Sequence, residues 1–182
     1  MNGPILLPYR GIMPRVAASA FVAPGVALIG DVEIGEDASI WFNCALRGDV
    51  AAIRVGARSN IQDGTIVHTS TGGPTIIGAG VTVGHQCLIH ACTLDDDCLV
   101  GMGAIVMDHA HVETAGWVGA GAMVTENKRV KAGELWLGRP AKFARAVSDE
   151  ERARIAGLAA RYVGRAKEYR AELGYDPERT LA

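Results

Sequence analysis

Aliphatic side chains recur at every sixth residue from Val22 to Val124, with three shifts of frame along the way. The recurring residues are Val22, Leu28, Ile34, Ile40, Leu46, Val55, Ile61, Val67, Ile77, Val83, Ile89, Leu94, Val100, Val106, Val112, Val118 and Val124. Four residues after each of them stands a small or β-branched side chain, and only Lys128, where the repeat ends, departs from this second pattern. A period of six fits neither an α-helix nor an alternating strand. It is typical of a β-helix, in which each hexad forms a short strand and a turn and three hexads complete one coil.

The repeat also sets the expected domain organisation. With 182 residues, the chain is long enough to form one domain with a sizeable core. We expect residues 1–137 to form the β-helix domain, with the segment 1–20 leading into it. Residues 138–182 are expected to supply a turn segment, a C-terminal α-helix and a tail, which pack on the β-helix. The expected fold class is therefore mainly β.

The C-terminal helix has separate start and stop signals. Ser148 and Glu151 have the spacing of a capping box, which begins a helix. Apolar residues at spacings of three and four continue to about Leu173, and Gly174 ends the pattern. We expect the helix to run along the outside of the β-helix and the tail to Ala182 to be frayed.

Composition argues against several classes of partner. A net charge of −2 gives no sign of binding to nucleic acid or to an anionic membrane. No apolar run reaches the length of a membrane helix. Pro4 and Pro8 interrupt the N-terminal apolar run, so we expect no signal peptide and a cytoplasmic location. The four cysteines form no C-x-x-C pair and are expected to be buried free thiols.

The six-residue count places two of the five histidines next to each other. Val67 and Ile89 are one coil apart, so His68 and His90, which follow them, occupy the same outward position on adjacent coils. Their backbones are then about 4.8 Å apart. Side chains at this spacing can share a metal ion with bonds of about 2.0 Å. Arg47 lies one coil earlier in the same column.

A third histidine belongs to another face. His85 lies two residues after Val83, so one subunit cannot easily turn it toward the same ion, whereas a three-fold trimer can. Two histidines from one chain and one from a neighbour leave a position for water, which is the layout of a catalytic zinc site. The alternative is a set of surface or interface histidines without a metal. His109 and His111 fall outside this column and are expected to be ordinary surface residues.

Several short motifs occur in a specific order on this repeat. They are Arg47-Gly48-Asp49, Asn60-Ile61-Gln62-Asp63, His68, Gly84-His85 and His90. In this order, on hexapeptide repeats followed by a helix, they resemble the γ-class carbonic anhydrase family over nearly the whole chain. The resemblance implies a left-handed parallel β-helix and a homotrimer with three metal sites at its subunit interfaces. The implied metal is Zn²⁺, with Co²⁺ or Fe²⁺ as alternatives that three histidines accept equally well.

The resemblance also implies roles for the residues around the metal. His68 and His90 of one chain and His85 of its neighbour match the metal ligands. Gln62 matches the residue that hydrogen-bonds the metal-bound water, and Asp63 matches a carboxylate close to it.

Four further residues match the family pattern. Arg47 and Asp49 match residues whose ion pairs join subunits. Asn60 matches an interior polar residue, which we expect a ladder of stacked amides to satisfy. Tyr162 resembles a tyrosine that some shorter members place near the metal.

The implied reaction is the reversible hydration of CO₂ to bicarbonate, with a metal-activated hydroxide as the nucleophile. Strongly active members carry a glutamate in an acidic loop after the first histidine, but residues 69–74 contain no carboxylate, and Val50 stands in place of a second glutamate. One alternative is therefore a metal-binding relative with little or no hydration activity. Another is a hexapeptide acyltransferase, because the fold alone does not determine the function. Such an enzyme needs a catalytic histidine but no metal-binding pair.

Overall fold

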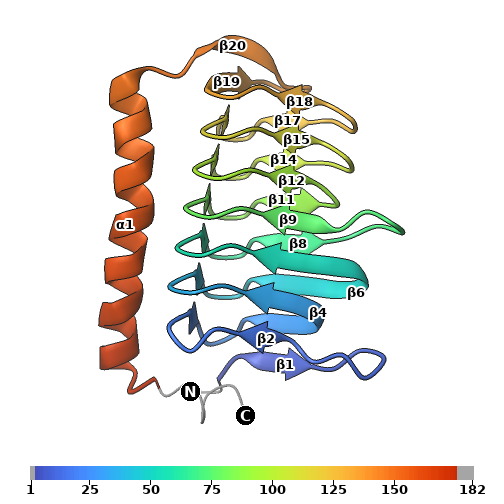
Figure 1. The fold of residues 1–182 in the computed structure, drawn as a ribbon, viewed down its shortest axis with the longest axis vertical. Coiled ribbons are helices and arrows are strands. Elements are labelled where there is room, and N and C mark those ends of the chain that lie inside the picture. Colours follow the sequence, from blue (N-terminus) through green and yellow to red (C-terminus); the bar gives the residue numbers. More distant parts are fainter. Residues whose placement is uncertain (1–2, 176–182) are drawn as a thin grey trace.

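Short parallel strands stack into a β-helix of about seven turns, and one long helix runs along its side (Figure 1). This confirms the predicted β-helix of hexapeptide repeats with a C-terminal helix. The computed structural model describes residues 3–175, so most of the tail that we expected to be frayed, up to Ala182, lies outside the described residues. Among residues 3–175, no helix combines the length and the apolar character needed to cross a membrane.

The strands are β1 (Ile5–Leu7), β2 (Arg15–Val16), β3 (Phe21–Val22), β4 (Ala27–Ile34), β5 (Ser39–Ile40), β6 (Ala45–Val55), β7 (Asn60–Ile61), β8 (Ile66–His68), β9 (Thr75–Ile77), β10 (Thr82–Val83), β11 (Leu88–His90), β12 (Thr93–Leu94), β13 (Leu99–Val100), β14 (Ile105–Val106), β15 (His111–Val112), β16 (Trp117–Val118), β17 (Met123–Val124), β18 (Arg129–Val130), β19 (Glu134–Leu137) and β20 (Lys142–Ala146). The helix is α1 (Asp149–Glu172).

The aliphatic residues of the repeat form three stacked columns, which define three faces. The first face carries Leu6, Leu28, Leu46, Val67, Ile89, Val106 and Val124 in register. The second carries Val16, Ile34, Val55, Ile77, Leu94, Val112 and Val130. The third carries Val22, Ile40, Ile61, Val83, Val100, Val118 and Trp136. All seventeen residues predicted from the repeat are at most 3% exposed, so each coil buries its apolar side chains against the next.

Small side chains fill the space between these columns. Cys44, Cys87 and Cys98 lie at small inward positions, and all four cysteines are buried free thiols, as predicted. Burial raises the pKa of the Cys44 thiol to about 12, so these groups pack as small hydrophobic side chains and not as thiolates.

Both ends of the chain add strands to the β-helix. In the N-terminal segment, β1 and β2 pair in parallel with β4 and contribute to the first coil. At the other end, β20 pairs antiparallel with β19. From the sequence, only a turn segment was expected between the repeat and the helix. The five residues of β20 are all exposed, so they carry no hydrophobic pattern from which a strand could be predicted.

Helix α1 covers the third face (Figure 1), where it contacts β3, β5 and β10. Ile155, Ala159 and Ala166 are its buried residues. Tyr162 and Tyr169 pack edge-on against Trp41, with ring centroids 5.4 and 5.3 Å apart. Aromatic contacts of this kind add to the hydrophobic stabilisation that holds the helix in place.

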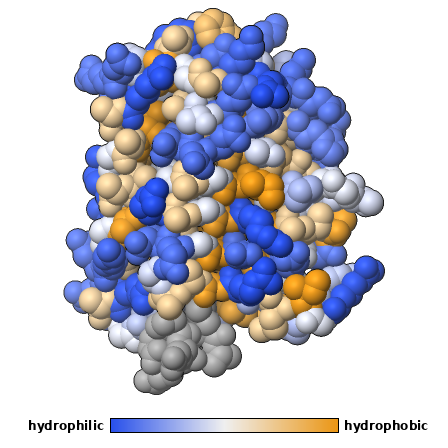
Figure 2. All heavy atoms as spheres, in the orientation of Figure 1, coloured by the Kyte–Doolittle hydropathy of each residue, from blue (hydrophilic) through white to orange (hydrophobic). Residues whose placement is uncertain are grey.

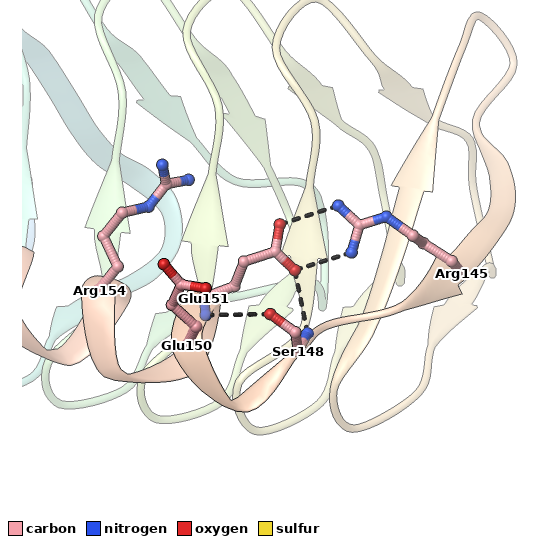
Figure 3. Close-up of a pocket in the computed structure, with 5 residues that line it drawn as sticks. All are labelled: Arg145, Ser148, Glu150, Glu151 and Arg154. Atoms are coloured by element: carbon pink, nitrogen blue, oxygen red, sulfur yellow. Dashed lines mark hydrogen bonds and ion pairs between the residues drawn. The ribbon is translucent and has the colours of Figure 1, made fainter.

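The predicted capping box begins the helix and lines a shallow charged pocket (Figure 3). Ser148 Oγ accepts a hydrogen bond from the Glu151 backbone N–H at 3.2 Å, and Glu151 Oε2 accepts one from the Ser148 N–H at 3.0 Å. Arg145 binds the same carboxylate with both terminal nitrogens, at 2.7 and 2.8 Å. This contact with Arg145, followed by the Ser148 backbone hydrogen bond, lowers the pKa of Glu151 to about 2.

Replacing Ser148 with alanine removes the acceptor for the Glu151 N–H. We expect the free energy of unfolding to fall by about 1 kcal/mol, the typical effect of a lost N-cap. Denaturant unfolding at matched protein concentration measures this change. Ser148→Asp retains an acceptor at the N-cap and serves as the control, and an equal loss in both variants would contradict the capping role.

Candidate metal centre

His68 and His90 lie side by side on the first face. β8 and β11 end in these residues, and the strand register pairs them directly, as the six-residue count predicts. His68 Nδ1 and His90 Nε2 are 3.1 Å apart, and the ring centroids are separated by 5.1 Å. The backbone of the repeat therefore brings one nitrogen of each ring to a common point.

The other nitrogen of each ring contacts a carboxylate. His68 Nε2 lies 3.1 Å from Asp49 Oδ1, and His90 Nδ1 lies 2.7 Å from Asp108 Oδ2. An ionised carboxylate can only accept hydrogen bonds, so these two ring nitrogens carry the protons. In neutral imidazoles, His68 Nδ1 and His90 Nε2 then face each other with lone pairs.

Two facing lone pairs repel each other unless a cation or a proton lies between them. Their 3.1 Å separation is close to the value of about 3.3 Å for two nitrogens that bind one tetrahedral ion with bonds of about 2.0–2.1 Å. Metal-binding histidines also commonly donate their second N–H to a carboxylate. The residues present therefore fit a zinc-like ion.

The charges around the pair are consistent with ionised carboxylates. Burial disfavours the charge on Asp49, but hydrogen bonds from Arg47 and His68 outweigh it and lower the pKa of this carboxyl. Burial likewise opposes ionisation of Asp108, whose pKa is lowered by hydrogen bonds from His90 and then Ser70. Both carboxylates remain acceptors near neutral pH.

His85 lies in the turn after β10, at the corner between the third and first faces. Its Nδ1 is 2.8 Å from Asp63 Oδ2, which leaves Nε2 for a further ligand. The side chains of His85 and Asp63 are both 43% exposed. Within residues 3–175 of one chain, no three or more His, Cys, Asp or Glu side chains are grouped so that they could hold a metal. The structure brings His68 and His90 together and leaves His85 at the corner.

Gln62 is held by a buried polar chain. Its Nε2 donates to Asn60 Oδ1 at 3.0 Å, and Asn60 Nδ2 donates to Thr82 Oγ1 at 2.8 Å. Asn60 is fully buried and Gln62 is 5% exposed. The expectation of stacked amides is wrong, because the strand register places Ser39 and Thr82 beside Asn60. The hydrogen bonds of residues 3–175 include none to the amide oxygen of Gln62, so this oxygen can accept one.

The remaining predicted residues lie in three places. Arg47 Nη1 contacts Asp49 Oδ2 at 2.5 Å within one chain, beside His68. Tyr162 lies on α1 against Trp41, and burial, followed by the nearby Asp63, raises the pKa of its hydroxyl. Tyr162 thus lies on the side of the third face, near Asp63. His111 lies on the second face, 2.8 Å from Asp95.

Asp108 is the residue that the sequence analysis missed. It follows β14 by two residues, and β14 pairs directly with β11, which carries His90. Extending the six-residue count by one coil beyond His90 would have brought Asp108 into the region of the site. No motif marked it.

The fold and these contacts define a hexapeptide-repeat protein that carries a carboxylate-supported histidine pair on one face. A carbonic anhydrase of Geobacillus kaustophilus is 42% identical over 167 residues, which cover 92% of each chain. γ-Carbonic anhydrase 1 of Arabidopsis thaliana, a mitochondrial protein, is 46% identical over 165 residues, or 87% of this chain. The chain belongs to the γ-carbonic anhydrase family.

The aligned region spans only 60% of the length of that plant relative. A solved structure of a hexapeptide transferase family protein from Anaplasma phagocytophilum has a TM-score of 0.88 and 49% identity, covering 91% of this chain and 98% of that one. No family model matches the chain.

Proposed function

We propose that this protein catalyses the reversible hydration of CO₂ to bicarbonate in a homotrimer. His68 and His90 of one subunit and His85 of the next would hold a metal ion, which we expect to be Zn²⁺, or alternatively Co²⁺ or Fe²⁺. The observation that carries this proposal is the 3.1 Å approach of one ring nitrogen of His68 to one of His90, while the other nitrogen of each ring contacts a carboxylate. Family membership supports the same reaction.

The third ligand has matching features. His85 Nδ1 lies 2.8 Å from a carboxylate, Asp63, and His68 and His90 likewise have a carboxylate each, which they contact through hydrogen bonds. Each of the three histidines therefore has one ring nitrogen beside a carboxylate and a second that can bind a metal. Because His85 lies at a corner and the pair lies on a face, a neighbouring subunit can supply it where a single chain cannot.

An apolar column on the first face supports the trimer. Two residues before the histidines, Ile66 and Leu88 point outward and are 42% and 38% exposed in the single chain. Ile105 and Met123 continue the column in register. Figure 2 shows hydrophobic residues in patches between hydrophilic ones on the side of the molecule that it presents. Apolar surface around a paired histidine site suits burial by a second subunit.

Arg47 and Asp49 border the same surface. In the trimer we expect their ion pair to extend across the interface, as the family resemblance implies. The side chain of Arg47 is 47% exposed in the single chain, so it has donors left for a partner.

The metal, when bound, would lower the pKa of water to about 7 and so supply a nucleophile at neutral pH. The chain's own residues then position the reactants. The free oxygen of the Gln62 amide would accept a hydrogen bond from the attacking water and orient it. Asn60 Oδ1 accepts a hydrogen bond from Gln62 Nε2, and this bond holds the amide with its oxygen on the other side.

The proton must finally reach solvent. Asp63 and Tyr162 are the candidates for this step. Asp63 lies beside His85, and Tyr162 lies near Asp63. The loop of residues 69–74 has no carboxylate to serve as a shuttle. We therefore expect external buffer to accept much of the proton flux.

Replacing Gln62 with alanine should lower the hydration rate by about 10–100-fold, in the range found for outer-shell groups of metal sites. The metal content should stay at the wild-type level, because Gln62 would contact the water and not the metal. Stopped-flow CO₂ hydration and metal analysis of the same sample measure the two effects. Loss of metal in this variant would show that the assigned role is wrong.

The direct test of the proposed function is CO₂ hydration by protein reconstituted with zinc, cobalt or ferrous iron. A metal-dependent rate supports it. If three fully loaded forms show no rate, the non-hydrating metal-binding relative is preferred. If transfer from acetyl-CoA occurs without metal, the acyltransferase alternative is preferred. The cytoplasmic location stays a prediction.

A further inference from the structure

We propose that Asp108, supported by the loop of residues 69–74, is a positioning residue that fixes the His90 ring and its tautomer for metal binding. This inference rests on the proposed metal site and assigns a residue outside the motifs that carry the family resemblance. Asp108 reaches His90 from the next coil, 18 residues further along the chain.

The contact between Asp108 and His90 is the shortest of the four histidine–carboxylate contacts in residues 3–175. Asp108 Oδ2 lies 2.7 Å from His90 Nδ1, against 2.8 Å for His85 and His111 and 3.1 Å for His68. The Asp108 side chain is 25% exposed, so water competes only partly for its oxygens. A charge-assisted hydrogen bond of this length favours the tautomer with the proton on Nδ1. Nε2, the nitrogen that faces His68, is then left with its lone pair.

The loop between β8 and β9 holds Asp108 from the other side. The Ser70 hydroxyl helps to lower the pKa of the Asp108 carboxyl, which places the two side chains near each other. Ser70 and Gly73 exchange two backbone hydrogen bonds, at 2.9 and 3.1 Å, which close the loop tightly. A Cβ atom added to Gly73 would lie 2.5 Å from Ser70 Oγ and 3.2 Å from Ala91 Cβ. The absence of a side chain at Gly73 therefore lets its backbone lie close to Ser70 and to the turn that follows His90.

This arrangement gives the loop a role that does not need an acidic residue. In the sequence, the only notable feature of this loop is that it lacks a carboxylate. Here its serine lies near a carboxylate supplied by the next coil, and that carboxylate contacts His90, a proposed metal ligand.

The test compares Asp108→Ala, Asp108→Asn and Ser70→Ala with Asp95→Ala. The control removes a carboxylate that contacts His111 at 2.8 Å on the second face, so it breaks a similar pair away from the site. Co²⁺ titration, followed by the visible absorption of the bound ion, measures affinity in each variant. Long-range proton–nitrogen NMR of metal-free, histidine-labelled protein measures the His90 tautomer.

We expect Asp108→Ala to weaken Co²⁺ binding by about 10–100-fold and to reduce the population of the Nδ1-protonated tautomer of His90. Asp108→Asn should fall between Asp108→Ala and the wild type, because an amide oxygen still accepts a neutral hydrogen bond. Ser70→Ala should have a smaller effect of the same sign, and Asp95→Ala should have none.

Wild-type affinity in Asp108→Ala, with an unchanged tautomer, would overturn the inference while leaving the metal site intact. Failure of the wild-type protein to bind Co²⁺ would instead overturn the proposed function. In that case the NMR measurement, which needs no metal, still tests the inference. An unchanged His90 tautomer in Asp108→Ala rejects it.

Discussion

Replacing His90 with alanine is expected to weaken Zn²⁺ or Co²⁺ binding by more than about 100-fold. Loss of an outer-shell partner alone typically costs 10–100-fold, and this change removes a direct ligand. It also leaves His68 Nδ1 without the nitrogen that faces it at 3.1 Å. The hydration rate should fall with the metal content. Calorimetric titration and metal analysis after dialysis measure the loss.

His111→Ala provides the matched control. His111 is half-buried and contacts a carboxylate, as His90 does, but it lies on the second face. We expect wild-type affinity in this control. If His111→Ala lost as much metal as His90→Ala, the histidine pair would not be the binding site.

Replacing Leu88 with lysine should break the trimer and release the metal together. Leu88 is 38% exposed on the first face, two residues before His90, where we expect the neighbouring subunit to cover it. Burying an unpaired lysine there would cost several kcal/mol. Light scattering should give a mass near 19.1 kDa in place of about three times that value. Metal content should fall, because a separated chain lacks the partner's His85.

Phe143→Lys tests whether any lysine at an exposed apolar position has this effect. Phe143 is 55% exposed on β20, at the end of the stack (Figure 1). We expect this variant to remain a trimer with a full complement of metal. A stable Leu88→Lys trimer with bound metal would show that the first face is not the interface.

The stacking of the coils could be predicted because the six-residue period counts strand positions directly. Val67 and Ile89 were predicted to share a column, and the register pairs them. The neighbouring positions of His68 and His90 followed from the same count. The contact between Asp63 and His85 is explained by the same kind of stacking on the third face, since Ile61 pairs with Val83.

Other parts of the site could not be predicted from the period. The partners of Asn60 depend on side-chain conformation. Asn60 forms hydrogen bonds with Thr82 and Gln62, whereas stacked amides from adjacent coils were expected. Asp108 lies in a turn, where the six-residue pattern says little about the direction of a polar side chain. Strand β20 lacks a buried face, so its pairing with β19 leaves no hydrophobic signature. The position of His85 relative to the pair depends on a second subunit.

The shared site can be tested most directly by mixing two inactive variants. His68→Ala and His85→Ala subunits, each with a different affinity tag, are co-expressed, and mixed trimers are isolated through both tags. In every mixed trimer, one interface joins an intact His68–His90 pair to an intact His85. Metal analysis should then find about one ion per trimer, against about three in the unmodified trimer and none in trimers of either variant alone. Mixed trimers that bind no metal would contradict a site built from two subunits.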